Sequence, residues 1–165
     1  MLAGTLLCQA GMKEGRYVTF FPSYGAEMRG GTANCQVILS DSPIGAPVVY
    51  EPDILLAFNR PSWERFSPKV RENGLTLNNS SLFSATGSGE GPEVFEVPAN
   101  RIAEECGSVI ATNTVMLGAL AARSAIVKLE GITSAVKELL KGKKQRVIDL
   151  NVKAAEEGYR FAKKG

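Results

Sequence analysis

The sequence contains no histidine, and its cysteines are too far apart to form a C-x-x-C pair. Cys8, Cys35 and Cys106 therefore predict neither a metal site nor an iron–sulfur site within this chain alone. The absence of histidine also removes the commonest general base and any Ser-His or Cys-His nucleophile pair. Unpatterned cysteines in odd number predict reduced, buried thiols in a cytoplasmic protein.

The sequence also lacks a long apolar run and an excess of charge of one sign. The run over residues 115–122 stops at Arg123, far short of the ~20 residues of a membrane helix. No basic residue precedes the N-terminal apolar run, and Leu7 rather than a small residue precedes Cys8, so no secretion signal is predicted. The 19 basic and 17 acidic side chains are interspersed, apart from a basic stretch at 137–146 that we interpret as a helix end and linker. We expect no nucleic-acid partner and no membrane association.

What is present predicts one domain over residues 1–165, since a chain of this length buries roughly 70% of its unfolded surface. Segments rich in β-branched or aromatic residues predict strands at 16–21, 35–40, 53–59, 74–81 and 93–100. We expect the first strand to close at Pro22. The second strand is apolar on both faces, which is typical of a central strand covered by helices. The prolines of 41–53 exclude a helix between the second and third strands.

Apolar spacing predicts helices at 1–10, from Pro61 onward, at 99–107, at 108–127 and at 145–164. Gly11 is the expected stop of the first helix, and Asn100 is a candidate N-cap. The last helix has an expected apolar face of Ile148, Val152, Ala155 and Tyr159. Asn113 and Thr114 are expected to cap a helix or to satisfy neighbouring backbone groups. Alternating strands and helices predict an α/β fold, with an open, mostly parallel sheet flanked by helices in a Rossmann-like arrangement.

Two glycine-rich stretches could bind anions. The G-x-G-x-G run at 87–91 is followed by Pro92 and a strand rather than by a helix, so a surface loop is favoured over a phosphate loop. In "SYGAEMRGGTANC", residues 23–35, Arg29 stands beside Gly30 and Gly31 and could bind phosphate or carboxylate. A connection between strands, with turn glycines and solvated charges, explains this stretch more simply.

The order of the residues in this second stretch is informative beyond their chemistry. "YGAEMRGGTANCQVILSDSPIGAPVV", with "PDILLAFN", "LTLNNSSL" and "NTVMLGALAA", resembles the gamma subunit of the 2-oxoacid:ferredoxin (acceptor) oxidoreductases, in the pyruvate, ketoisovalerate and 2-oxoglutarate group. The resemblance covers about residues 15–122. Members begin with a strand and a G-x-G-G-Q-G loop, so this chain looks like a member that lacks its first strand, through truncation or a misplaced start.

The resemblance implies an assisting subunit, inactive alone, of an enzyme that oxidatively decarboxylates a 2-oxoacid to acyl-coenzyme A. Thiamine diphosphate and iron–sulfur clusters belong to partner subunits, namely alpha, beta and a ferredoxin-like delta subunit. The implied coenzyme A-facing or interface residues are Tyr24, Gly25, Glu27, Arg29, Gly30 and Gly31. Ser40, Asp41, Pro43 and Ile44 complete the motif, and Glu27 would orient Arg29.

A rival hypothesis is a free-standing nucleotide- or anion-binding α/β module without catalytic partners. The wording "PSYGAEMRGGTANC" favours versions associated with 2-oxoglutarate or branched-chain 2-oxoacids, and we favour 2-oxoglutarate. A chain without its first strand would also expose an apolar sheet edge and could self-associate.

Overall fold

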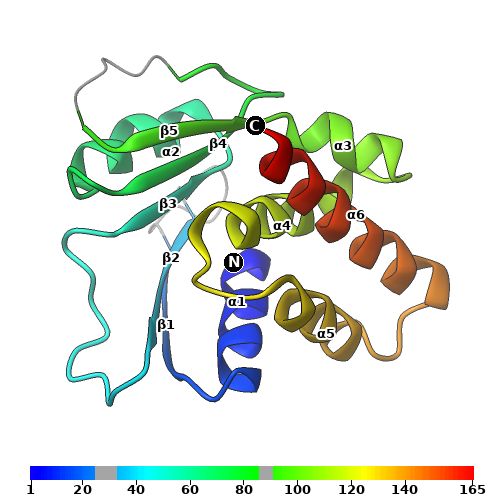
Figure 1. Ribbon diagram of the computed structural model, residues 1–165, viewed down its shortest axis with the longest axis horizontal. Coiled ribbons are helices and arrows are strands. Elements are labelled where there is room, and N and C mark those ends of the chain that lie inside the picture. The colour runs from blue at the N-terminus through cyan, green and yellow to red at the C-terminus, as the bar shows by residue number, and fades with distance from the viewer. Residues whose placement is uncertain (25–32, 86–90) are drawn as a thin grey trace.

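The computed structural model describes residues 1–24, 33–85 and 91–165 (Figure 1). The helices are α1 (Leu2–Lys13), α2 (Arg60–Phe66), α3 (Ala99–Glu105), α4 (Thr112–Ser124), α5 (Leu129–Leu139) and α6 (Gln145–Lys164), with 3-10 turns η1 (Ser67–Lys69) and η2 (Val109–Ala111). The strands are β1 (Tyr17–Tyr24), β2 (Ala33–Ser40), β3 (Ile54–Ala57), β4 (Leu75–Asn79) and β5 (Glu93–Val97). In these described ranges no helix is long and apolar enough to cross a membrane.

The strands form two sheets. β3, β4 and β5 are parallel and neighbour one another in that order, with Ile54 opposite Leu75 and Leu75 opposite Glu93. α4 contacts β4, α6 contacts β5 and α2 contacts β3, so helices flank this sheet. The predicted α/β class with a parallel sheet is therefore confirmed. β1 and β2 instead form an antiparallel hairpin, so the prediction that 35–40 is a central strand of the main sheet is wrong.

Two of the predicted ends of elements are also wrong. β1 does not close at Pro22 but continues to Tyr24, because each strand of a two-stranded sheet has an edge where a missing N–H costs no ladder bond. Gly11 does not stop α1 but is buried within it, where a Cβ would lie 2.5 Å from Leu39 Cδ2. The helix ends two residues after Gly11, and Gly15, at φ +78°, turns the chain toward β1.

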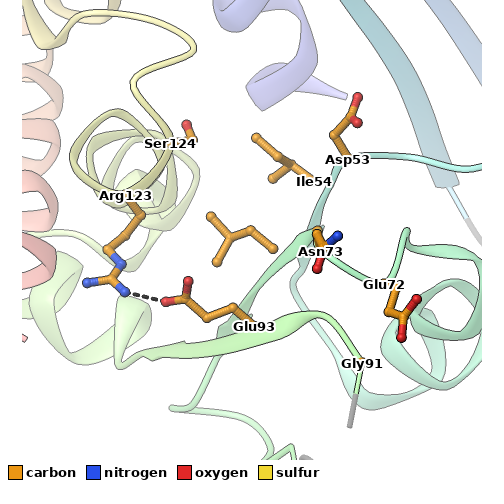
Figure 2. Close-up of a pocket in the computed structure, with 10 residues that line it drawn as sticks. Asp53, Ile54, Glu72, Asn73, Gly91, Glu93, Arg123 and Ser124 are labelled. Atoms are coloured by element: carbon orange, nitrogen blue, oxygen red, sulfur yellow. Dashed lines mark hydrogen bonds and ion pairs between the residues drawn. The ribbon is translucent and has the colours of Figure 1, made fainter.

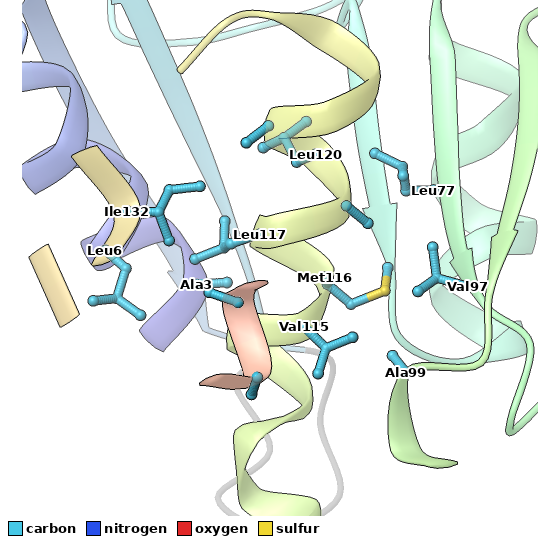
Figure 3. Close-up of a cluster of buried hydrophobic side chains, with 14 of the residues drawn as sticks. Ala3, Leu6, Leu77, Val97, Ala99, Val115, Met116, Leu117, Leu120 and Ile132 are labelled. Carbon is cyan, nitrogen blue, oxygen red and sulfur yellow. The ribbon is translucent and has the colours of Figure 1, made fainter. Parts of the chain in front are cut away.

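The core is centred on α4 (Figure 3). Leu77 and Val97 of the parallel sheet lie on one side of this helix, while Leu6 of α1 and Ile132 of α5 lie on the other. The structure also contains α5 as a separate helix, which the sequence analysis did not predict. Because α4 is surrounded in this way, its almost uniformly apolar sequence is explained.

α4 and α6 pack so closely that their backbones touch. A Cβ on Gly118 would clash with the carbonyl of Ala155, and a Cβ on Gly158 would clash with the carbonyl of Val115. The buried residues of α6 are accordingly small or polar: Asn151, Ala154, Ala155, Gly158 and Ala162. Of the predicted apolar face, Ala155 belongs to this set, while Val152 and Tyr159 pack half-buried against the core.

Candidate functional site

The structure places the first residue of the predicted motif at the end of the hairpin where residues 25–32 connect its two strands. Tyr24 is the last residue of β1 and pairs with Ala33, the first residue of β2. The other candidate site residues lie outside the described residues, and their roles stay predictions: Gly25, Glu27, Arg29, Gly30 and Gly31. The first four residues of the 87–91 glycine run also lie outside them.

The first turn of α1 packs beside this end of the hairpin. A Cβ on Gly4 would lie 2.5 Å from Cys35 Sγ and 2.8 Å from Phe20 Cε2, so only a glycine allows this approach without a shift of those side chains. Cys35 is two residues from the start of β2. The end of the hairpin that carries Tyr24 and Ala33 is therefore held against the N-terminal turn of α1.

The second half of the motif lies at the opposite end of β2. At about 3.3 Å per residue, Ser40 is about 23 Å from Ala33. Arg16 Nε forms an ion pair of 3.2 Å with Asp41 Oδ1, and Arg16 Nη1 donates a hydrogen bond of 2.7 Å to the Ile126 carbonyl. Ser40 Oγ accepts from the Ser42 N–H at 3.1 Å. The structure therefore does not bring the two halves of the motif together. In the second half, Ser40 and Asp41 make contacts that fix the chain where it leaves β2.

An asparagine cluster lies where β4 ends. Asn79 Nδ2 donates to Asn100 Oδ1 at 2.8 Å, and Thr112 Oγ1 donates to the same oxygen at 3.2 Å. Asn100 lies inside α3, whose N-cap is Pro98, so the predicted N-cap role of Asn100 is wrong. Its side chain instead links the end of β4 to the start of α4. Thr114 donates to the Ala111 carbonyl at 2.7 Å, which confirms its predicted role of satisfying the backbone.

Asn78 is the polar residue that sequence reasoning missed. It is fully buried, and neither Oδ1 nor Nδ2 has a hydrogen-bond partner among the described residues. Its neighbour Leu77 packs in the core, so the Asn78 side chain projects from the opposite face of β4. The signal in the sequence is the pair of adjacent asparagines, Asn78 and Asn79, at the end of this strand.

A cavity of about 550 Å³ lies at the other edge of the parallel sheet, at the amino ends of its strands (Figure 2). Arg123 forms an ion pair with Glu93 and lies 4.5 Å from the centre of the Phe95 ring. Asp53 forms an ion pair of 2.7 Å with Arg71. Ligands of open α/β sheets bind at the carboxyl ends of the strands, so we interpret these charges as structural.

The three cysteines are free thiols. Burial and the nearby Cys35 raise the pKa of Cys8 to about 11, and burial raises the pKa of Cys106. Of the three, only Cys8 is fully buried, so the predicted burial holds for that thiol while the other two are half-buried. Within residues 1–24, 33–85 and 91–165, no group of three Cys, Asp or Glu side chains could hold a metal ion.

These observations define an α/β protein with an open parallel sheet and an appended hairpin. The chain belongs to the pyruvate ferredoxin/flavodoxin oxidoreductase family, whose model matches residues 1–161. It is 38% identical over 162 residues to the ketoisovalerate oxidoreductase subunit VorA of Methanothermobacter marburgensis, covering 98% of this chain and 34% of that protein. It is 34% identical to the 2-oxoglutarate synthase subunit KorC of Methanocaldococcus jannaschii, covering 99% of this chain and 87% of KorC.

A solved structure gives the same result for the fold. The gamma subunit of a keto/oxoacid ferredoxin oxidoreductase from Geobacter sulfurreducens is similar with a TM-score of 0.83 at 27% identity, covering 99% of this chain and 91% of that one. This chain spans about a third of the length of VorA but most of the length of the gamma subunit and of KorC.

Proposed function

We propose that residues 1–165 act as one gamma-type domain, the gamma subunit of a 2-oxoacid:ferredoxin oxidoreductase. The enzyme would convert a 2-oxoacid and coenzyme A into acyl-coenzyme A and carbon dioxide, with electrons passed to ferredoxin. The observation that carries this proposal is the family match over residues 1–161, together with the likeness to a gamma subunit along nearly the whole of both chains.

In this proposal the chemistry belongs to partner subunits. Thiamine diphosphate supplies the carbanion chemistry and iron–sulfur clusters accept the electrons, and both would be held by alpha, beta and delta subunits. The sequence of this chain supports that division, because it has no histidine and no C-x-x-C pair. We propose the cytoplasm as its location, since its three cysteines are unpaired.

The role of this chain would be to assist assembly and to bind coenzyme A. Coenzyme A carries phosphates, which a guanidinium group binds with paired hydrogen bonds. Arg29 with the Gly30 and Gly31 amides would contact these phosphates or the partner surface, and Glu27 would orient Arg29. Tyr24 and Gly25 would lead the chain into this loop from the end of β1.

We propose 2-oxoglutarate or a branched-chain 2-oxoacid as the substrate. Relatives of this chain are named for 2-oxoglutarate and for ketoisovalerate. No observation favours the free-standing binding module over an enzyme subunit.

The test is to co-express the chain with candidate thiamine-binding subunits from the same organism and to measure coenzyme A-dependent oxidation of several 2-oxoacids. Arg29→Ala should raise the KM for coenzyme A about tenfold or weaken assembly, as loss of a charged hydrogen bond of about 1.5 kcal/mol predicts. Arg101→Ala, at an exposed arginine of α3, is the matched control. Equal turnover and assembly of Arg29→Ala and the parent would overturn the role of the loop.

A further inference from the structure

A groove of about 400 Å³ lies between α3 and α6, which pack side by side (Figure 1). Its lining comes from these two helices and from Cys106, which ends α3. Four of the lining side chains are basic and two are acidic. The groove therefore carries an excess of positive charge, whereas the 19 basic and 17 acidic residues of the whole chain nearly balance.

The uncompensated charge of the groove comes from two lysines. Glu105 and Glu157 each form an ion pair with an arginine of the same helix, at 3.9 Å and 2.6 Å. Lys153 and Lys164 form no ion pair with any carboxylate among the residues that the structure describes. A carboxylate that enters the groove can therefore pair with either lysine without displacing another partner.

The two lysines share one side of α6 but lie far apart along it. The step from Lys153 to Lys164 is close to three helical turns, so both side chains project from the same face. At 1.5 Å per residue they are about 16 Å apart along the helix axis. Both side chains lean toward the N-terminus of the helix, so this separation is kept. A phosphate or another single small anion can therefore contact one lysine but not both.

Apolar side chains line the groove between the two lysines. Phe161 of α6 lies between Lys153 and Lys164 along the helix, and Ile102 of α3 also lines the groove. The Phe161 ring packs against the Phe95 ring, with their centres 6.3 Å apart, which limits its movement. The groove thus combines an apolar patch with an unpaired ammonium group on either side of it along α6.

We propose that the groove between α3 and α6 binds an acidic segment of another polypeptide, in which an apolar residue stands between two carboxylates. Alternate side chains of an extended peptide point to the same side, at about 3.3 Å per residue. Carboxylates at the first and fifth positions are therefore about 13 Å apart, within reach of Lys153 and Lys164 on their flexible stems. The third side chain points the same way and would meet Phe161. This inference goes beyond the proposed function and does not depend on it.

The charges of the groove favour a peptide over a nucleic acid. A nucleic acid presents closely spaced phosphates, which need a continuous basic stripe. Here Glu105 and Glu157 stand among the basic side chains of the groove and would repel such a backbone. A peptide avoids this repulsion because its carboxylates can be placed only where the lysines are.

The test measures binding of the fluorescein-labelled peptide GSEALAESG to the full chain by fluorescence anisotropy at low salt. Lys153→Glu and Lys164→Glu should each weaken binding about fivefold, because each reversal turns an exposed attraction into a repulsion. Lys69→Glu is the matched control, since it makes the same change of charge at an exposed lysine of η1, outside the groove. Binding to this control should stay within twofold of the parent. Lys153→Gln and Lys164→Gln decide the question if a charge reversal unfolds the chain.

Three results would overturn the inference. The first is that the peptide does not bind, or that it binds the parent and both groove variants equally. The second is that GSEASAESG, in which serine replaces the central leucine, binds as tightly as GSEALAESG, because the apolar patch would then have no role. The third is that a labelled single-stranded oligonucleotide binds more tightly than the peptide and is weakened by the same lysine variants, which would make nucleic acid the occupant.

Discussion

The α4–α6 pair and the β1–β2 hairpin both use glycine for close packing, but they differ in what the glycines touch. Gly118 and Gly158 bring two helix backbones together, whereas Gly4 and Gly11 admit the side chains of the hairpin. Backbone cannot move aside locally, while a side chain can change its rotamer. The packing of α4 against α6 is therefore rigid, because backbone meets backbone. The hairpin packs on α1 through side chains that can shift, next to the candidate site.

The largest expected effect tests the rigid half. Gly118→Ala should lower the free energy of unfolding by about 3 kcal/mol or more, because the added methyl group meets the Ala155 carbonyl. Gly45→Ala is the control, since nothing lies within 4 Å of a Cβ at Gly45. Denaturant unfolding of the two variants measures the difference. An equal stability for both would show that α4 and α6 are not in backbone contact.

The next effect compares two neighbouring asparagines of β4. Asn79→Leu should lower the free energy of unfolding by about 2 kcal/mol, because two hydrogen bonds are lost, the one that Asn79 Nδ2 donates to Asn100 Oδ1 and the one that Asn79 Oδ1 accepts from the Ser81 N–H. Asn78→Leu should raise it by about 1 kcal/mol, because both of its buried polar atoms are unpaired within the described part of the chain. A loss of stability for Asn78→Leu would show that its amide has a partner in solution.

A smaller effect is expected where α1 meets the hairpin. Gly4→Ala should lower the free energy of unfolding by about 1 kcal/mol, since Cys35 and Phe20 can shift to admit the methyl group. Thermal or denaturant unfolding checks this value against that of Gly118→Ala. A loss as large as that of Gly118→Ala would remove the contrast between the two regions.

The smallest effect concerns an exposed ion pair between α1 and α5. Lys13 Nζ lies 2.6 Å from Glu138 Oε2, and this contact lowers the pKa of Glu138. A lowered pKa in the folded state contributes stability above the unfolded pKa that is lost as the pH falls through the folded one. Lys13→Gln should move the pKa of Glu138 back toward its ordinary value in an NMR titration. Lys69→Gln is the control and should leave the pKa of Glu138 unchanged. If Lys69→Gln moves this pKa and Lys13→Gln does not, the contact with Lys13 is not its cause.

The sequence predicted the elements of the fold better than their contacts. The parallel strands and α6 are recognisable because composition and apolar spacing are local properties of the chain. The role of Gly11 is not local: it depends on Leu39, which pairing in the hairpin brings against α1. The predicted face of α6 packs against the core through Val152, Ala155 and Tyr159. It missed Gly158, whose burial depends on α4 lying against it.

The candidate site was predicted less completely. The motif reads as one continuous signature in the sequence, but β2 separates its ends by about 23 Å at 3.3 Å per residue. Asp41 therefore pairs with Arg16 rather than with the loop that follows Tyr24. The amide of Asn78 has no hydrogen-bond partner among the described residues, and the asparagine pair in the sequence did not predict this, because the burial of Asn78 results from packing on both faces of β4.

The most direct test of the central claim is turnover by the reconstituted complex with and without this chain. We expect that the thiamine-binding and ferredoxin-like subunits oxidise 2-oxoglutarate or a branched-chain 2-oxoacid with coenzyme A only when the chain is added. Equal coenzyme A-dependent turnover in its absence would contradict the assignment of this chain as an assisting subunit.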